Sequence, residues 1–386
     1  MSRRAKKVCV CTGTRAEYGI LRPVMRRIAK SKALELQVAA AGMHLAREFG
    51  HTVDHIERDG FEIHARVEML PDDDTPAAMA ASVARGIAGF TDAFENLATE
   101  VVVVLGDRTE AFAAAVAGAL SGRVVAHVHG GDRAEGGYDD YMRHAVTKMA
   151  HVHFAATEGA ARRIRRLGER ADRIHTVGAP GLDEIKPSKL PPVTLTRRSY
   201  GFAPRKPLIL AVQHSISTHP ETADAEMKET LAALEALSLP TILIRPNSDA
   251  GGRAMTAAIE EFGEKPWLSV HASLPRDDFL AAMKAARAMV GNSSAGIIEA
   301  AAFHLPVVNV GRRQAGRERS GNTVDVPPDR CKIEAALRKV LYDRVARGRL
   351  CAAQNVYGDG RASARIVGIL ERIETGGEIL AKQITY

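Results

Sequence analysis

Several features that would mark a secreted or membrane protein are scarce or missing. The 386 residues include only 4 cysteines, and no apolar run approaches the ~18–20 residues that span a bilayer. Cys9 and Cys11 alternate along one short strand, which favours buried free thiols over a disulfide framework. The basic start Met1–Lys7 lacks the apolar core of a signal peptide. We therefore expect a cytoplasmic protein without a membrane segment.

Aromatic residues are also scarce, and this bears on the basic charge of the chain. Lys and Arg number 53 against 46 acidic residues, but aromatics make up only 5%. The basic residues are spread over amphipathic helices such as 161–167, where few aromatics interleave with them. This pattern is typical of a solvated basic face, and the remaining charge suits a small anion such as a nucleotide diphosphate. We expect no nucleic-acid partner.

The length and the hydrophobic pattern predict two α/β domains. A chain of this length exceeds one ordinary core. Continuous apolar runs, typical of strands buried on both faces, alternate with helical patterns in each half. The strands are expected at 7–12, 36–42, 101–106, 124–130 and 152–156, and again at 208–213, 241–245, 268–271, 288–291 and 307–311. The helices between them are expected at 20–29, 76–97, 110–120, 141–149, 158–167, 221–237, 255–261, 277–285 and 296–302.

A stretch rich in glycine and proline, 178–207, predicts the boundary between the domains. We expect domains at 1–185 and 186–360, and a C-terminal helix and tail at 361–386 that packs back toward the first domain. The fold class is α/β, with two Rossmann-like domains facing across a cleft. Ligands of such sheets bind beyond the carboxyl ends of the strands, so the loops after strands are the first candidates for a site.

Two polar loops follow strands early in the first half. The segment 13–19 separates the first strand from the first helix and offers backbone to an anion, although it matches neither GxGxxG nor GxxxxGK[ST]. Asp107 directly follows the buried strand 101–106. It is either the N-cap of the next helix or a carboxylate whose pKa is adjusted for exchanging a carbon-bound proton.

A third loop, 127–137, combines histidines, acids and two pairs of glycines. His127 and His129 alternate along a strand, but no third ligand stands at a spacing diagnostic of a metal site. Arg143 lies on the following helix, where it either belongs to the site or forms surface ion pairs with Asp139 and Asp140.

In the second half, a turn at 291–296 opens a helix and offers amides and hydroxyls to a diphosphate. Glu299, one turn on, is placed to accept from ribose hydroxyls; the alternative is an ordinary capping arrangement. Gln213–Ser215 follow another strand, and three arginines follow the last one: Arg312, Arg313 and Arg317.

Taken together, these segments resemble the hydrolysing UDP-N-acetylglucosamine 2-epimerases of sialic-acid-type sugar biosynthesis. The matching stretches are 13–19 (GTRAEYG), 42–50 (GMHLAREFG), 106–110 (GDRTE), 127–132 (HVHGGD), 143–149 (RHAVTKM), 178–183 (GAPGLD), 291–299 (GNSSAGIIE) and 311–316 (GRRQAG). The resemblance implies a GT-B-like domain pair that binds a nucleotide sugar, needs no metal or cofactor, and forms a homo-oligomer, either a dimer or a tetramer. It also implies the reaction: UDP departs as carbon 2 loses its proton, and water then adds to the 2-acetamidoglucal.

The resemblance also assigns residues. It implies that Asp107 and Asp139 are acid–base carboxylates and that Arg143 orients them or contacts phosphate. Arg15 would reach the phosphates, and His44 would lie near the sugar. The second domain would bind the nucleotide and diphosphate through His214, Asn247, Ser293, Ser294, Glu299 and Arg313.

The chain departs from the family pattern at two positions. Non-hydrolysing relatives carry Lys where this chain has Ile20, which favours the hydrolysing branch. Many members carry Glu at the position of His129, so a carboxylate role there is lost or passes to Asp132 or Glu135. Our hypothesis is that His129 donates a proton or binds the sugar, because its unperturbed pKa suits acid–base work near neutrality.

We rank UDP-N-acetylglucosamine, converted to N-acetylmannosamine and UDP, as the first substrate. The same reaction on a UDP- or GDP-linked 2,4-diacetamido-2,4,6-trideoxyglucose for legionaminic acid synthesis is the alternative. A GT-B glycosyltransferase and a non-catalytic nucleotide-sugar sensor are the rival classes.

Overall fold

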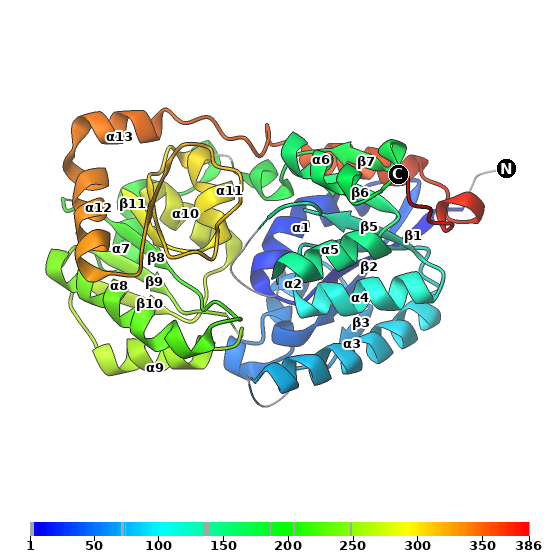
Figure 1. Ribbon diagram of the computed structural model, residues 1–386, viewed down its shortest axis with the longest axis horizontal. Coiled ribbons are helices and arrows are strands. Elements are labelled where there is room, and N and C mark those ends of the chain that lie inside the picture. The colour runs from blue at the N-terminus through cyan, green and yellow to red at the C-terminus, as the bar shows by residue number, and fades with distance from the viewer. Residues whose placement is uncertain are drawn as a thin grey trace. The chain divides into compact units, whose positions relative to one another are not determined.

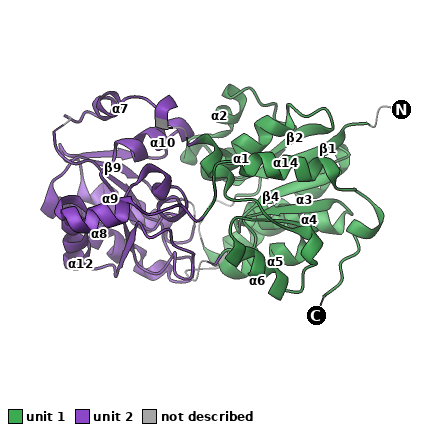
Figure 2. Ribbon diagram, turned by 90° about the horizontal axis from the view of Figure 1, so that it is seen from above, with its two compact units in different colours: residues 1–132, 139–184, 357–386 green, residues 133–138, 185–356 purple. Residues whose placement is uncertain are grey.

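The computed structural model describes residues 4–70, 73, 75–133, 139–185, 187–203, 205–247 and 249–385. The chain forms two compact units, coloured separately in Figure 2. The first unit holds residues 1–132, 139–184 and 357–386, and the second holds 133–138 and 185–356. Each unit is built on one parallel sheet covered by helices (Figure 1), which confirms the predicted pair of Rossmann-like domains.

The sheet of the first unit has the strand order β3-β2-β1-β4-β5-β6-β7. Its strands are β1 (Lys6–Thr12), β2 (Leu34–Ala41), β3 (Ala65–Val67), β4 (Val101–Leu105), β5 (Val124–Val128), β6 (Val152–Ala155) and β7 (Ile174–Thr176). The predicted apolar runs form the buried centre of this sheet, where Cys9 and Cys11 are also buried as free thiols. Leu105 pairs with Val128, so the loops that follow β4 and β5 leave the sheet at the same edge.

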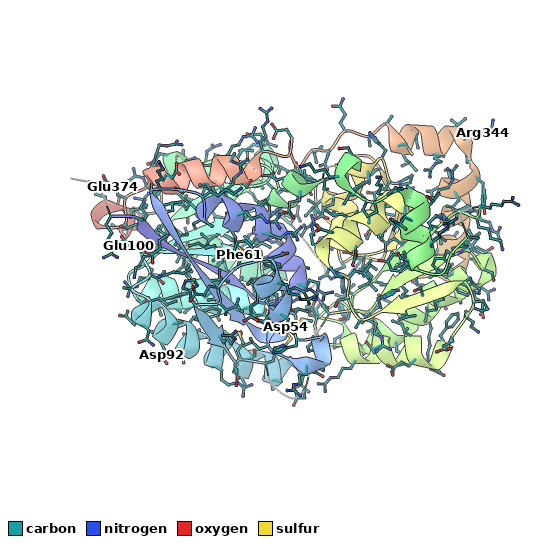
Figure 3. The ribbon with its side chains drawn as sticks, turned by 180° about the vertical axis from the view of Figure 1, so that it is seen from behind. Asp54, Phe61, Asp92, Glu100, Arg344 and Glu374 are labelled. Atoms are coloured by element: carbon teal, nitrogen blue, oxygen red, sulfur yellow. The ribbon has the colours of Figure 1, made fainter. Side chains whose placement is uncertain are left out.

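The helices of the first unit are α1 (Arg15–Ile28), α2 (Val53–Arg58), α3 (Pro76–Asn96), α4 (Thr109–Leu120), α5 (Asp139–Met149), α6 (Glu158–Arg166) and α14 (Ala362–Arg372). Helix α14 comes from the end of the chain and packs beside α1, where Ile366 and Leu370 join the core around Leu21 (Figure 2). Near the N-terminal end of α1, the ring of Phe61, labelled in Figure 3, packs edge to face against the ring of Tyr18, with 6.3 Å between the ring centroids.

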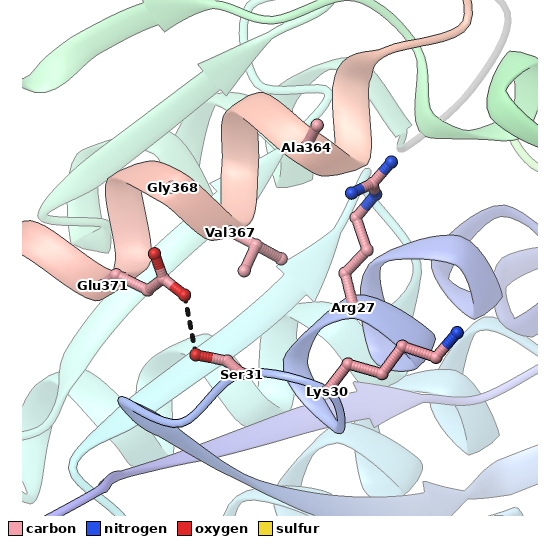
Figure 4. Close-up of a pocket in the computed structure, with 7 residues that line it drawn as sticks. All are labelled: Arg27, Lys30, Ser31, Ala364, Val367, Gly368 and Glu371. Atoms are coloured by element: carbon pink, nitrogen blue, oxygen red, sulfur yellow. Dashed lines mark hydrogen bonds between the residues drawn. The ribbon is translucent and has the colours of Figure 1, made fainter.

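A cavity of about 280 Å³ lies between α1 and α14 (Figure 4). The Ser31 hydroxyl donates to Glu371 across it at 2.7 Å. Its lining residues Arg27, Lys30 and Ser31 belong to the C-terminal end of α1 and the residues just after it, about 20 Å from the helix N-terminus at the carboxyl edge of the sheet. This cavity is therefore separate from the loops where a ligand was expected.

Helix α1 begins at Arg15, so the expectation that the loop extends to Gly19 was wrong. The cause is a capping box: the Thr14 hydroxyl accepts from the Glu17 amide at 3.2 Å, and the Glu17 carboxylate accepts from the Thr14 amide at 3.0 Å. Two reciprocal hydrogen bonds satisfy helix-end donors that would otherwise be unpaired, and they start the helix one turn earlier than its apolar pattern does.

The sheet of the second unit has the order β10-β9-β8-β11-β12-β13. Its strands are β8 (Ile209–Val212), β9 (Thr241–Ile244), β10 (Leu268–His271), β11 (Ala288–Gly291), β12 (Val307–Val310) and β13 (Thr323–Val326). Its helices are α7 (Val193–Ser199), α8 (Ala223–Leu237), α9 (Gly252–Phe262), α10 (Arg276–Ala285), α11 (Ser294–Ile298), α12 (Arg330–Tyr342) and α13 (Arg344–Cys351). Across both units, none of the described helices is long and apolar enough to cross a bilayer.

Candidate active site

Residues from the loops after β4 and β5 and from α5 form a largely buried group of charged side chains in the first unit. Arg143 on α5 makes an ion pair with Asp107, which follows β4. Its guanidinium also lies 3.9 Å from the carboxylate of Asp132 and donates to the carbonyl of His129 at 3.3 Å. We call Asp107, His129, Asp132 and Arg143 the charged cluster.

The structure decides between the alternatives that the sequence left open for two of these residues. Arg108, not Asp107, occupies the N-cap position of α4, and no side chain caps that helix. Arg143 is only 2% exposed, so it does not form a surface ion pair. A buried arginine needs carboxylate partners to offset its desolvation, and the loops after β4 and β5 supply them.

His129 has an unusual backbone and an unsatisfied side chain. Its φ is 62°, in the left-handed region that non-glycine residues seldom adopt. Nδ1 lies 3.1 Å from the Asp132 carboxylate, so this nitrogen carries the proton. Nε2 is buried and has no hydrogen-bond partner among the described residues. Backbone strain and a buried unpaired nitrogen are both costly, and both are typical of a site that binds a ligand or moves a proton.

His44 is a neutral imidazole held on both sides. Its Nε2 lies 3.0 Å from the Thr12 hydroxyl and its Nδ1 lies 2.7 Å from the Thr52 hydroxyl. Burial, and next the charge of Arg15, lower the pKa of His44 to about 3. Arg15 itself contacts His55 at the start of α1. His44 is therefore suited to shaping the site rather than to taking up a proton.

Sequence reasoning missed two buried carboxylates in this unit, Glu17 and Glu110. Both contact Gly13: its amide donates to Glu17 at 2.9 Å, and a Cβ on Gly13 would lie 2.5 Å from the carboxyl carbon of Glu110. Burial raises the pKa of Glu17 to about 7, and the negative charge of Glu110 adds to the rise. Arg108 pairs with Glu110 at 3.3 Å. The sequence did contain a signal for them: each glutamate lies in a quoted motif that follows an apolar strand, Glu17 in 13–19 and Glu110 in 106–110.

Two predicted site residues lie wholly or partly outside the part of the chain that the structure describes. Glu135 lies outside the described residues. Asp139 is the first residue of α5, four positions before Arg143, but its side chain lies outside the described part of the chain. Among the described residues, no three His, Cys, Asp or Glu side chains cluster as metal ligands would.

In the second unit, Asn292 fixes the loop after β8. Its side-chain oxygen accepts from the His214 amide at 2.7 Å and its nitrogen donates to the His214 carbonyl at 2.9 Å. His214 Nδ1 in turn accepts from the Asn247 amide at 3.2 Å. Gly291 (φ 121°) makes this approach possible, because a Cβ there would lie 2.0 Å from the Val212 carbonyl oxygen.

Polar groups surround this loop. Ser293 caps α11 by accepting from the Ala295 amide at 3.4 Å. Arg313 donates to the Asn292 carbonyl at 3.4 Å. We call His214, Asn247, Asn292, Ser293 and Arg313 the amide site, since backbone and side-chain amides dominate it.

The predicted ribose partner Glu299 is already engaged. It forms a buried ion pair at 2.8 Å with Arg276 of α10, a residue that the sequence reasoning did not single out. Both side chains are less than a tenth exposed. A ribose hydroxyl that donates a hydrogen bond to Glu299 would therefore share the carboxylate with Arg276.

Comparisons with known proteins show which family the chain resembles. The family described as UDP-N-acetylglucosamine 2-epimerase matches residues 26–371. A Legionella pneumophila protein described as UDP-N,N'-diacetylbacillosamine 2-epimerase (hydrolyzing) is 37% identical over 99% of this chain and 100% of its own. A Campylobacter jejuni GDP/UDP-N,N'-diacetylbacillosamine 2-epimerase (hydrolyzing) is 32% identical over 84% of this chain and 85% of its own.

A solved structure supports the fold. The Neisseria meningitidis UDP-GlcNAc 2-epimerase bound to UDP-GlcNAc superposes with a TM-score of 0.79, covering 94% of this chain and 99% of that one at 18% identity. The two parallel-sheet units therefore have a GT-B-like fold.

Proposed function

Because the chain belongs to the UDP-N-acetylglucosamine 2-epimerase family, we propose that it is a hydrolysing 2-epimerase. Its substrate is a UDP-linked 2-acetamido sugar, and its products are UDP and the free sugar with carbon 2 inverted. The observation that carries this proposal is the charged cluster of the first unit, together with the Nε2 of His129, which is buried and has no hydrogen-bond partner in the described part of the chain.

The reaction proceeds in two balanced steps. A base removes the proton from carbon 2, the C–H electrons form the C1=C2 double bond, and the C1–O bond breaks to release UDP. An acid then returns a proton to the opposite face of carbon 2, while the oxygen of a water molecule bonds to carbon 1 and the water gives one proton to the conjugate base of that acid. These proton transfers need one base and one acid, each positioned next to carbon 2. Each such transfer contributes about 10²–10⁴-fold to the rate.

The charged cluster has the groups that these steps require. Asp107, held against Arg143, is a carboxylate acceptor, and Asp139 is the second acid–base carboxylate of the proposal. His129 supplies a ring nitrogen, Nε2, with its tautomer fixed by Asp132. Arg143 stabilises the charge that develops as UDP departs.

The amide site binds the nucleotide part. His214, Asn247 and Ser293 offer neutral donors and acceptors, Ser294 is the next residue after Ser293 and the first of α11, and Arg313 supplies a positive charge for the diphosphate. Arg15, at the start of α1, contributes a second positive charge. Glu299, held in place by Arg276, accepts hydrogen bonds from the ribose hydroxyls and orients them.

The relatives favour two substrates for the same chemistry. UDP-N-acetylglucosamine, which gives N-acetylmannosamine, is the substrate that the family name supports. The Legionella and Campylobacter relatives support N,N'-diacetylbacillosamine, the 2,4-diacetamido-2,4,6-trideoxyglucose considered above, linked to UDP or, as the Campylobacter name allows, to GDP. We further propose a cytoplasmic homo-oligomer, a dimer or a tetramer, which light scattering on the purified protein will test.

Proton NMR in deuterated water tests the function directly. Each nucleotide sugar is incubated alone with the protein. Release of UDP and of the manno-configured sugar, with deuterium at carbon 2, is the expected result and identifies the substrate. Turnover only after an acceptor is added would indicate a glycosyltransferase, and tight binding without UDP release would indicate a sensor.

A further inference from the structure

One buried histidine of the first unit does not belong to the charged cluster but lies directly behind it. His127 of β5 is fully buried. Its Nε2 lies 2.8 Å from the carbonyl of Gly106, the residue before Asp107. Its Nδ1 lies 3.2 Å from the hydroxyl of Thr147, one helical turn after Arg143 on α5. The imidazole therefore joins the two elements that carry the Asp107–Arg143 ion pair.

The chemistry of these partners fixes the state of the ring. A carbonyl oxygen can only accept, so Nε2 carries the proton and donates to Gly106. Nδ1 is then an acceptor, and the Thr147 hydroxyl donates to it. Burial lowers the pKa of His127 to about 3, which agrees with a permanently neutral ring. A neutral imidazole with both nitrogens occupied cannot exchange protons with a substrate.

The same ring also limits the loop that carries His129 and Asp132. A Cβ on Gly130 would lie 2.8 Å from His127 Nδ1 and 3.3 Å from the Thr147 hydroxyl. Glycine at this position lets the loop pass directly over the imidazole. His127 thus touches all three segments from which the charged cluster is assembled: the loop after β4, the loop after β5, and helix α5.

We propose that His127 is a positioning residue that holds Asp107 and Arg143 in register for proton transfer at carbon 2. This inference rests on the proposed function for its kinetic consequence, but its structural consequence stands alone. Small displacements of acid–base groups are costly, since about 1 Å can reduce turnover ~10²-fold.

The test replaces His127 by Phe, which fills the space of the ring and removes both hydrogen bonds. We expect kcat to fall ~30–100-fold while KM stays within about threefold, because ground-state contacts to the nucleotide are untouched. The variant His127→Gln retains an amide donor for Gly106 and should recover part of the loss. Thr147→Val removes one bond only and should give a smaller fall in kcat.

The chain offers a matched control in the same sheet, on the side where β4 begins rather than where it ends. Gln37 of β2 is also buried, donates to a backbone carbonyl (Leu97, 2.9 Å) and accepts from a threonine hydroxyl (Thr99, 2.7 Å). Gln37→Leu and Thr99→Val therefore remove the same kinds of bond away from the site. They should lower the unfolding temperature as the His127 and Thr147 variants do, but leave kcat unchanged.

Crystal structures of the wild type and of His127→Phe without substrate complete the test. We expect Asp107 and Arg143 to separate in the variant. An intact pair, or equal kcat in His127→Phe and Gln37→Leu, overturns the inference. If the wild type turns over none of the nucleotide sugars, the proposed function fails, and the crystal structures still decide whether His127 holds the pair. If His127→Phe does not fold, the comparison of Thr147→Val with Thr99→Val takes its place.

Discussion

The two units share a fold but place different chemistry at the carboxyl edges of their sheets. In the first unit, charged side chains meet in pairs, with the half-buried Asp107 against the buried Arg143 and with Glu17 near Glu110, both buried. In the second unit, the amide site is mostly neutral, and its loop is fixed by hydrogen bonds such as those of Asn292 to His214.

This difference indicates a division of labour. Buried, coupled charges have perturbed proton affinities, which proton transfer requires. Neutral donors around an arginine hold an anion without taking part in proton exchange. On the proposed function, changes in the first unit should therefore reduce turnover, and changes in the second should weaken binding.

The largest effect is expected from Asp107→Asn, which keeps the shape of the side chain and removes its charge. Loss of an acid–base carboxylate should lower kcat about 10³-fold. Affinity for UDP, measured by calorimetry, should stay within about twofold, because the proposed nucleotide contacts are those of the amide site and of Arg15 and do not include Asp107. Retention of turnover with loss of UDP affinity would reverse the proposed division.

Asp59→Asn is the matched control. Asp59 also pairs with a buried arginine of the first unit, Arg22, at 3.1 Å, but it does not belong to the charged cluster. This variant should lose stability and keep its kcat.

A smaller effect, about 10²-fold on kcat, is expected from His129→Asn. Asparagine tolerates a φ of 62° better than most residues, so the change removes the titratable nitrogen while preserving the strained backbone. Single-turnover kinetics measure the loss. His129→Ala with undiminished turnover would eliminate a proton-transfer role for this residue and leave the task to the carboxylates.

The contrast between the units was only partly readable from the sequence. The apolar runs predicted the central strands because a strand buried on both faces has a distinctive composition. The edge strands β3, β7 and β13 were missed, since each is short and only partly buried. Periodicity is weak over three or four residues, so pairing in the sheet, not local pattern, defines them.

The site was readable where a polar residue directly follows a buried strand, as with Asp107. Pairings that depend on tertiary contacts were not readable. Arg276 lies 23 positions before Glu299, and nothing local relates the two. Glu17 reads as a capping residue, and only the fold brings Glu110 to the other side of Gly13.

In the second unit, Arg313→Met should raise KM about tenfold and leave kcat unchanged, since a charge-assisted hydrogen bond to a diphosphate is worth ~1.5–3 kcal/mol. Steady-state kinetics with the substrate identified by NMR will show the separation. The control is Arg338→Met, a surface arginine paired with Glu334, which should change neither constant. A fall in kcat for Arg313→Met would mean that the amide site takes part in the chemical steps.

The last effect concerns stability rather than turnover. The pKa of Glu17 is raised from 4.5 to about 7, so the folded state retains a proton there that the unfolded chain has already lost. The contribution of Glu17 to the stability of the first unit should therefore fall as pH rises from about 4.5 to 7, by up to about 3 kcal/mol, and level off above.

Hydrogen exchange at pH 5 and pH 7, corrected for intrinsic rates, can follow peptides of each unit separately. The first-unit histidines whose pKa burial lowers, such as His44 and His127, contribute in the opposite sense, so the test compares variants rather than units. We expect first-unit peptides of the wild type to lose protection at pH 7 relative to the same peptides of Glu17→Gln, while second-unit peptides of the two proteins respond alike. Glu110→Gln should shrink this difference, since burial is the larger cause of the raised pKa and the neighbouring charge the smaller. An equal pH response of the wild type and Glu17→Gln would show that the coupled carboxylates do not set the first unit apart.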